Sequence, residues 1–237
     1  MTRHFGVLIP STNTTCEIEF GRLLPPVFQA HFGRLQSSRP GFPFSPSREE
    51  DIDYQARLLG TARVGLVILA QTSASLFAED YDEVTVKRMS EASGAPALTS
   101  AQAVGRAVRA LGLRRIALVS PYSDEVNERA ARYFARNYGL DTVAREGFAA
   151  TDSYAIGGLG PENAHAAFRR IDRPEIEAFV VPGGNFPTMP HIAAWEREFT
   201  KPVVTTNQAS VWAMLRALAP DERLSGFGRL LESAPAG

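Results

Sequence analysis

The sequence contains few of the residues that most often bind metals or form disulfides. Among its 237 residues there are one cysteine, Cys16, and four histidines. A single cysteine excludes a disulfide within the chain and a zinc site built from thiolates. The histidines are far apart in the sequence, and we expect each to be structural or exposed: His4, His31, His165 and His191.

The sequence also lacks an excess of charge and a long hydrophobic run. Its formal net charge is −1, so no overall basic field favours nucleic acid or an acidic membrane surface. The N-terminal run HFGVLIP is shorter than a signal peptide requires. No apolar run approaches the roughly 20 residues that span a bilayer. We expect a soluble, cytoplasmic protein without nucleic-acid or membrane partners, and a homo-oligomer remains open.

What the sequence does contain is an alternation of strand-like and helix-like segments. Two of them, GLVILAQTSASLF at 65–77 and AFVVPGGNFPTM at 178–189, begin apolar and break into polar or glycine-rich turns. This pattern is typical of a buried parallel strand followed by a turn and a helix. Ligands of open α/β sheets bind just beyond such strand ends. Two equivalent strand tips therefore predict a site between two similar halves.

Matching segments recur along the chain in the same order. Pro121 follows Pro10 by 111 positions, Gly183 follows Gln71 by 112, and PVVTTNQA at 202–209 follows PALTSAQA at 96–103 by 106. The alternative is that strand–loop–helix units merely resemble one another. We predict an α/β fold of two pseudo-symmetric, Rossmann-like halves, each with a doubly wound parallel sheet. The first half is expected to comprise residues 1–98 plus 207–237, and the second residues 99–206.

Polar residues follow the predicted strand ends. Residues 11–14, STNT, lie between a strand and a helix, where hydroxyls, backbone N–H groups and the helix dipole favour an anion such as a carboxylate. The alternative is that they only cap the helix, and the same two readings apply to 72–73 and 122–123. Gly183 and Gly184 permit a close backbone approach and can present N–H donors to an oxyanion, or form a plain turn.

Five motifs together resemble one enzyme superfamily. GVLIPSTNT at 6–14 resembles the opening of the aspartate/glutamate racemase superfamily, in its maleate isomerase and arylmalonate decarboxylase branch. AQTSAS at 70–75 resembles the first catalytic loop of that branch, A-C-T-S-G-S, and GGNF at 183–186 its second, C-T-N-F. PY at 121–122 matches its tyrosine loop, and DSYAIG at 152–157 is similar to a D-N-x-x-I/V-G segment that supplies a polar ligand group.

This resemblance implies an active site between two halves, a small carboxylate or dicarboxylate ligand, and no cofactor or metal. It implies that Tyr122 is the catalytic proton donor. The implied substrate-binding residues are Ser11, Asn13, Gln71, Thr72, Ser73, Ser123, Ser153, Gly183, Gly184 and Asn185.

The sequence departs from the family at both catalytic cysteines. Gln71 and Gly183 stand where the family has two opposed thiols, of which decarboxylase members lack the first and keep the second. Without thiols, two-base racemisation and thiolate addition to a double bond lose their agents. Cys16 begins an apolar stripe with Phe20 and Leu24, so we expect it in the core, although a helix start lowers a thiol pKa. Cysteines introduced at Gln71 and Gly183 are expected to face one another across the cleft.

Three functions fit these residues. The first is a cofactor-independent enzyme of isomerase or lyase type that acts on a small carboxylate without the usual cysteine pair. The second is a carboxylate-binding protein without catalysis. The third is a hydrolase that uses the same cleft, with Gln71, Gly183 and Gly184 as an oxyanion hole.

Overall fold

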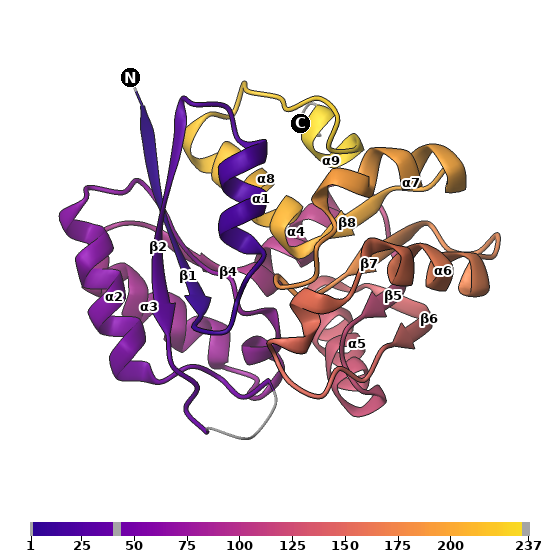
Figure 1. Cartoon of the computed structure of the whole chain (residues 1–237), viewed down its shortest axis with the longest axis horizontal. Coiled ribbons are helices and arrows are strands. Elements are labelled where there is room, and N and C mark those ends of the chain that lie inside the picture. The colour runs from indigo at the N-terminus through magenta and orange to yellow at the C-terminus, as the bar shows by residue number, and fades with distance from the viewer. Residues whose placement is uncertain (1, 40–43, 234–237) are drawn as a thin grey trace.

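A computed structural model describes residues 2–39 and 44–233 of the chain and contains two parallel sheets (Figure 1). The first part comprises β1 (Arg3–Pro10), α1 (Cys16–Leu23), β2 (Phe28–Leu35), α2 (Glu49–Thr61), β3 (Val67–Leu69), the 3₁₀ helix η1 (Thr72–Leu76), α3 (Tyr81–Ser93), β4 (Ala97–Thr99) and α4 (Ser100–Ala110). The second comprises β5 (Arg115–Ser120), α5 (Asp124–Tyr138), β6 (Asp141–Gly147), η2 (Ala155–Gly158), α6 (Pro161–Ile171), β7 (Ala178–Val181), η3 (Met189–His191), α7 (Ile192–Phe199), β8 (Val203–Thr205), α8 (Thr206–Leu218) and α9 (Arg229–Glu232).

The two sheets have the same topology. Their strand orders are β2-β1-β3-β4 and β6-β5-β7-β8, and neighbouring strands in each sheet run parallel. The connections change direction between β1 and β3 in the first sheet and between β5 and β7 in the second. These positions are the topological switch points at which α/β proteins bind ligands. The predicted α/β fold with two pseudo-symmetric Rossmann-like halves is thus confirmed.

Strand β1 is buried on both faces and so joins the first sheet to two cores. Phe5, Val7 and Ile9 belong to a large apolar cluster that extends through the second sheet, whereas Leu8 faces a smaller cluster with α2 and α3. Successive side chains of a strand point to opposite faces, so a continuous apolar run can fill both. Helices α4 and α8 contact each other at the centre of the molecule, between the two sheets (Figure 1).

Equivalent caps begin the two central helices. Thr99 accepts a hydrogen bond from the backbone N–H of Gln102, whose side chain accepts one from the backbone N–H of Thr99. Thr205 and Gln208 form the same reciprocal pair 106 positions later. Each capping box satisfies N–H groups that a helix start otherwise leaves unpaired. The segments 96–103 and 202–209 therefore correspond in structure as in sequence.

The structure adds detail where the sequence predicts only loops. Residues 72–76 form η1, residues 155–158 form η2, and the weakly patterned tail contains α9. Of the loop predicted at 37–47, residues 40–43 lie outside the described residues. Within the described part of the chain, no helix is both long enough and apolar enough to cross a membrane. Each sheet comes from one continuous stretch of chain, and the boundaries at 98/99 and 206/207 stay a prediction.

Candidate active site

The carboxyl ends of β1, β3, β5 and β7 surround one inner cavity of about 40 Å³. The residues that line it are Pro10, Thr12, Asn13, Phe44, Ala70, Gln71, Thr72, Ser73, Tyr122, Ser153, Ile156, Gly183, Gly184 and Asn185. Every predicted site residue is among them except Ser11 and Ser123. The structure therefore brings together loops that are more than 170 positions apart in the sequence.

The two exceptions have different positions. Ser11 lines a larger outer vestibule of about 600 Å³, which shares Phe44 and Gln71 with the inner cavity. Ser123 precedes the first turn of α5 as its N-cap and lies outside the lining of both spaces. The chain turns into α5 at this point, which carries Ser123 away from the neighbouring Tyr122. Sequence reasoning missed Phe44 and Ile156 as lining residues, since apolar side chains carry no chemical signature, and it included Thr12 only within the loop at 11–14.

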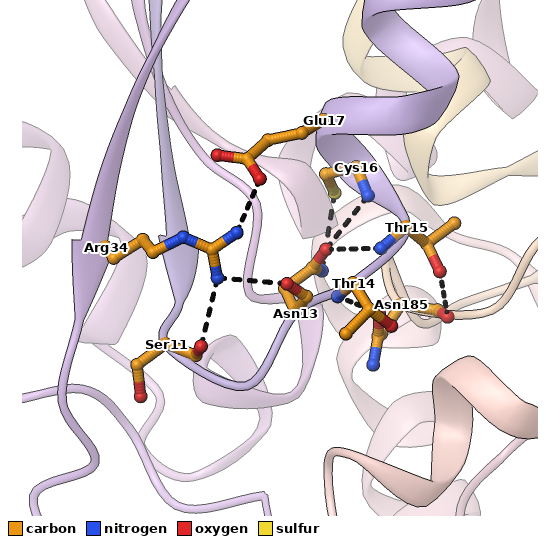
Figure 2. Close-up of polar contacts among 8 residues, drawn as sticks. All are labelled: Ser11, Asn13, Thr14, Thr15, Cys16, Glu17, Arg34 and Asn185. Carbon is orange, nitrogen blue, oxygen red and sulfur yellow. Dashed lines mark hydrogen bonds and ion pairs between the residues drawn. The ribbon is translucent and has the colours of Figure 1, made fainter.

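The loop after β1 is fixed by contacts to its backbone. Asn13 Oδ1 accepts hydrogen bonds from the backbone N–H groups of Thr15 (3.0 Å) and Cys16 (2.9 Å), so its side chain caps α1 (Figure 2). Arg34 at the end of β2 donates to the carbonyl oxygens of Ser11 and Asn13, both at 3.0 Å. The same guanidinium forms an ion pair with Glu17 at 2.5 Å, so Arg34 links this loop to the first turn of α1. A strand arginine gives no sequence signal for such a role.

Asn185 joins the two halves across the cavity. Its Oδ1 accepts from the backbone N–H of Thr14 at 2.7 Å, and its Nδ2 donates to the Ser153 carbonyl at 2.8 Å. The Thr15 hydroxyl also donates to the Asn185 carbonyl at 2.7 Å (Figure 2). The Asn185 amide therefore positions the loops that bound the cavity. A direct contact of Asn13 or Asn185 with a substrate stays a prediction.

Hydroxyl groups form the contact between the first and second strand tips. Thr72 Oγ1 lies 3.0 Å from Ser100 Oγ and 3.0 Å from Thr206 Oγ1. Thr206 Oγ1 also accepts from the Gly183 backbone N–H at 2.9 Å. Ser100 and Thr206 are the first residues of the equivalent helices α4 and α8. This buried network therefore lies close to the pseudo-two-fold axis that relates the two halves.

Tyr122 brings a fully buried hydroxyl to the cavity. Its ring packs edge-to-face against Phe44, with ring centroids 5.1 Å apart. Burial raises the pKa of Tyr122, and a hydrogen bond with Ser73 offsets only part of this rise. Burial disfavours the charged phenolate. Tyr122 is consequently a neutral hydrogen-bond donor over the pH range of a folded protein.

Cys16 lies behind the second strand tip and is not a lining residue of the cavity. Its thiol donates to the carbonyl oxygen of Gly184 and to Asn207 Oδ1, both at 3.2 Å. Burial, and next the nearby Glu19, raise the pKa of the Cys16 thiol despite its hydrogen bonds with Asn13 and Asn207. Burial is thus the main influence on the pKa of this thiol, and the thiol stays protonated.

Glu19 is a buried carboxylate beside this thiol that sequence reasoning missed. Its Oε1 accepts from the backbone N–H groups of Thr188 (2.8 Å) and Met189 (2.9 Å). Its Oε2 accepts from Asn207 Nδ2 at 2.6 Å. Burial raises the pKa of Glu19, and these three hydrogen bonds lower it in part. Glu19 therefore holds α1, α8 and the segment after the second tip together.

The histidines lie away from the cavity. His4 Nδ1 and His31 Nε2 are 2.9 Å apart, His165 Nε2 lies 2.7 Å from Glu198, and His191 stacks on Trp195. Among residues 2–39 and 44–233, no group of three or more histidine, cysteine, aspartate or glutamate side chains is arranged to hold a metal ion.

The described lining of the cavity offers neutral donors rather than charges. No aspartate, glutamate, lysine, arginine or histidine is among its described lining residues. Within the described residues, the backbone N–H groups of Ser73, Gly184 and Asn185 donate to no protein acceptor. Unpaired N–H groups beside a buried cavity stabilise an oxyanion strongly, because little water competes there. This arrangement suits a small carboxylate.

Comparison with known proteins agrees with this arrangement. The family model of arylmalonate decarboxylase matches residues 45–231 of the chain. A maleate isomerase of Pseudomonas putida is 27% identical over 243 residues, covering 97% of each protein. An arylmalonate decarboxylase of Bordetella bronchiseptica is 28% identical over 244 residues, covering 98% of each protein.

Solved structures extend this similarity to the whole fold. A crystal structure of a cysteine-to-alanine variant of the Pseudomonas putida maleate isomerase Iso with maleate aligns with a TM-score of 0.87 at 26% identity, covering 99% of both chains. Unliganded arylmalonate decarboxylase aligns with a TM-score of 0.77 at 26% identity, covering 97% of this chain and 99% of that one. With its two equivalent sheets, the cavity at their switch points and the match of the family model over most of its length, the chain belongs to the arylmalonate decarboxylase family.

Proposed function

We propose that this protein is a cofactor-independent enzyme that binds a small dicarboxylate in the inner cavity and decarboxylates it. The observation that carries the proposal is the set of neutral donors at the cavity. These are the Tyr122 hydroxyl and the backbone N–H groups of Ser73, Gly184 and Asn185, which donate to no acceptor among the described residues. Such donors can stabilise the negative charge that builds up on the remaining carboxylate in the transition state more than they stabilise the charge of the bound substrate.

The proposed reaction requires no thiolate. In a malonate-type acid, the bond from the α-carbon to one carboxylate breaks, carbon dioxide leaves, and the electron pair moves into an enediolate. The N–H donors stabilise the enediolate oxygens. The neutral Tyr122 hydroxyl then gives its proton to the α-carbon, and the phenolate recovers a proton from water.

An isomerase reaction by thiolate addition is less well supported. A Nocardia farcinica maleate cis-trans isomerase mutant, which aligns with a TM-score of 0.84 at 25% identity, has been crystallised with a covalently bound succinylcysteine intermediate. In this chain we infer that Gln71 and Gly183 occupy the two cysteine positions. The remaining thiol, Cys16, is fully buried and protonated behind Gly184. For this reason we favour the lyase over the isomerase.

A carboxylate-binding protein without catalysis is the second candidate. The inner cavity measures only about 40 Å³, and Tyr122 is the one ionisable side chain among its described lining residues. Such a site can bind an anion without converting it. Hydrolysis has less support, because no described lining residue is a base that activates water.

A ligand screen followed by a turnover assay tests the proposal. We expect malonate or a similar small dicarboxylate to raise the melting temperature, because ligand binding stabilises the folded state. Proton and carbon NMR should then show slow loss of carbon dioxide from the bound acid. Tyr122→Phe, which removes only the hydroxyl, should lower turnover about a hundredfold or more. Stabilisation without turnover would establish the binding protein instead, and no stabilisation by any small carboxylate would refute both.

A further inference from the structure

The side chain of Gln71 is hydrogen-bonded at both ends to one short segment, residues 44–47. Its Oε1 accepts from the backbone N–H of Ser47 at 3.1 Å and from the Ser47 hydroxyl at 2.8 Å. Its Nε2 donates to the Ser45 carbonyl at 3.0 Å. Gln71 is buried, so these bonds form with little competition from water. The Oε1 atom has no acceptor site left for a ligand, and only one of the two Nε2 hydrogens remains unused.

The segment held by Gln71 carries Phe44 to the boundary between the inner cavity and the vestibule. Phe44 lines both spaces, and its ring packs against Tyr122. Its φ of 63° lies in the left-handed region, which is unusual for a bulky side chain. A strained residue of this kind persists only where its surroundings fix it. The Gln71 bonds are adjacent to Phe44 and provide such a constraint.

We propose that Gln71 is a positioning residue that holds Phe44 over the inner cavity and thereby restricts the ligand to small carboxylates without an aryl substituent. The identity of the ligand rests on the proposed function, whereas the positioning role does not. The inner space of about 40 Å³ and the vestibule of about 600 Å³ meet at Phe44 and Gln71, which line both. Without the aromatic ring the two spaces join, and a phenyl group finds room.

The positioning role is tested in the ligand-free protein by hydrogen exchange. Gln71→Met preserves the length of the side chain and removes its donor and acceptor. We expect the Ser47 amide proton, which bonds directly to Gln71, to exchange about tenfold faster or more. The Ser38 amide, which donates to the Pro46 carbonyl at 2.9 Å, serves as an internal reference and should change less.

A matched control and a second variant accompany this measurement. Gln29→Met makes the same substitution at an exposed glutamine on β2 and should leave Ser47 exchange unchanged. Gln71→Glu is the alternative variant if Gln71→Met does not fold. It retains an acceptor for Ser47 but places a carboxylate oxygen next to the Ser45 carbonyl oxygen, and this repulsion should also speed exchange of the Ser47 amide proton. Wild-type exchange of Ser47 in a folded Gln71 variant would overturn the proposal.

The restriction on ligand size is tested by calorimetric binding of malonate and phenylmalonate. Wild-type protein should prefer malonate. Gln71→Met and Phe44→Ala should each shift the ratio of the two dissociation constants toward phenylmalonate by about tenfold, whereas Gln29→Met should not. An unchanged ratio in both variants would overturn the size restriction. If no form binds either acid, the proposed function fails, while the exchange experiment still decides the role of Gln71.

Discussion

The sulfur atom of Cys16 lies 3.2 Å from the carbonyl oxygen of Gly184 and is fully buried. The one thiol of the chain is thus directly behind the second strand tip, where a hydrogen bond and its raised pKa keep it protonated. Only the thiolate is an effective nucleophile.

The first prediction is that Cys16 is almost inert in the folded protein. With a thiol-specific chromogenic reagent, native protein should react far more slowly than the urea-unfolded chain, and addition of malonate should not change the native rate. The physical reason is that reaction requires local unfolding around the buried sulfur. Fast reaction that a small carboxylate suppresses would show that Cys16 belongs to the binding site.

The second prediction concerns the cost of introducing a cysteine at Gly183. Gly183 has a φ of +115°, and a Cβ atom there would lie 2.9 Å from Pro121 Cγ. Gly183→Cys should therefore lower the free energy of unfolding by about 1–3 kcal/mol. Urea denaturation measures this loss, with Gly158→Ala as a control because a Cβ at Gly158 meets no atom within 4 Å. Equal stability of Gly183→Cys and wild type would contradict the prediction.

The third prediction concerns the hydroxyl network between the tips. Thr206→Val removes the acceptor for the Gly183 N–H and the partner of the Thr72 hydroxyl, so it should cost about 1–3 kcal/mol of unfolding free energy. Thr206→Ser keeps the hydroxyl and should cost less. The comparison is made by chemical denaturation of the three proteins. Equal losses in both variants would mean that the methyl group, not the hydroxyl, matters at this position.

The fourth prediction is a pH dependence of stability that arises from Glu19. Burial raises the pKa of this carboxyl above its unfolded value, and its hydrogen bonds oppose the rise only in part. Its contribution to stability is therefore full below the unfolded pKa and is lost as the pH rises through the folded pKa. Glu19→Gln removes this titration.

The measurement is the difference in melting temperature between wild type and Glu19→Gln. As the pH rises from about 4 to about 8, the melting temperature of wild type should fall relative to that of Glu19→Gln. Glu83→Gln, at an exposed position of α3, should run parallel to wild type. A constant difference between wild type and Glu19→Gln would show that the raised pKa is not coupled to folding.

The fifth prediction is that the protein does not racemise aspartate or glutamate. Removal of the α-proton and its return on the other face require two opposed bases, whereas Gln71 and Gly183 are not basic. NMR in deuterium oxide should show no deuterium at Cα of either amino acid. Incorporation above that of a Tyr122→Phe preparation, which controls for contaminating racemase, would contradict the prediction and assign the exchange to Tyr122.

The sequence by itself determined the local elements and the convergence of the strand tips. Strand and helix periodicities are properties of neighbouring residues, and the capping boxes at Thr99 and Thr205 join residues only three positions apart. Since carboxyl ends of parallel strands meet at one edge of a sheet, the motifs at 70–75 and 183–186 were sufficient to predict a shared cavity.

Only the tertiary structure decided which polar atoms remain for a ligand. The Asn185 amide is taken by Thr14, 171 positions away, and the Gln71 amide by Ser45 and Ser47, 26 and 24 positions away. Hydrogen bonds between distant segments depend on how the loops pack, which no local pattern specifies. For the same reason the buried Glu19 carboxylate could not be distinguished in the sequence from an exposed glutamate. The sequence predicted most of the polar lining residues of the cavity, and packing assigned their hydrogen bonds.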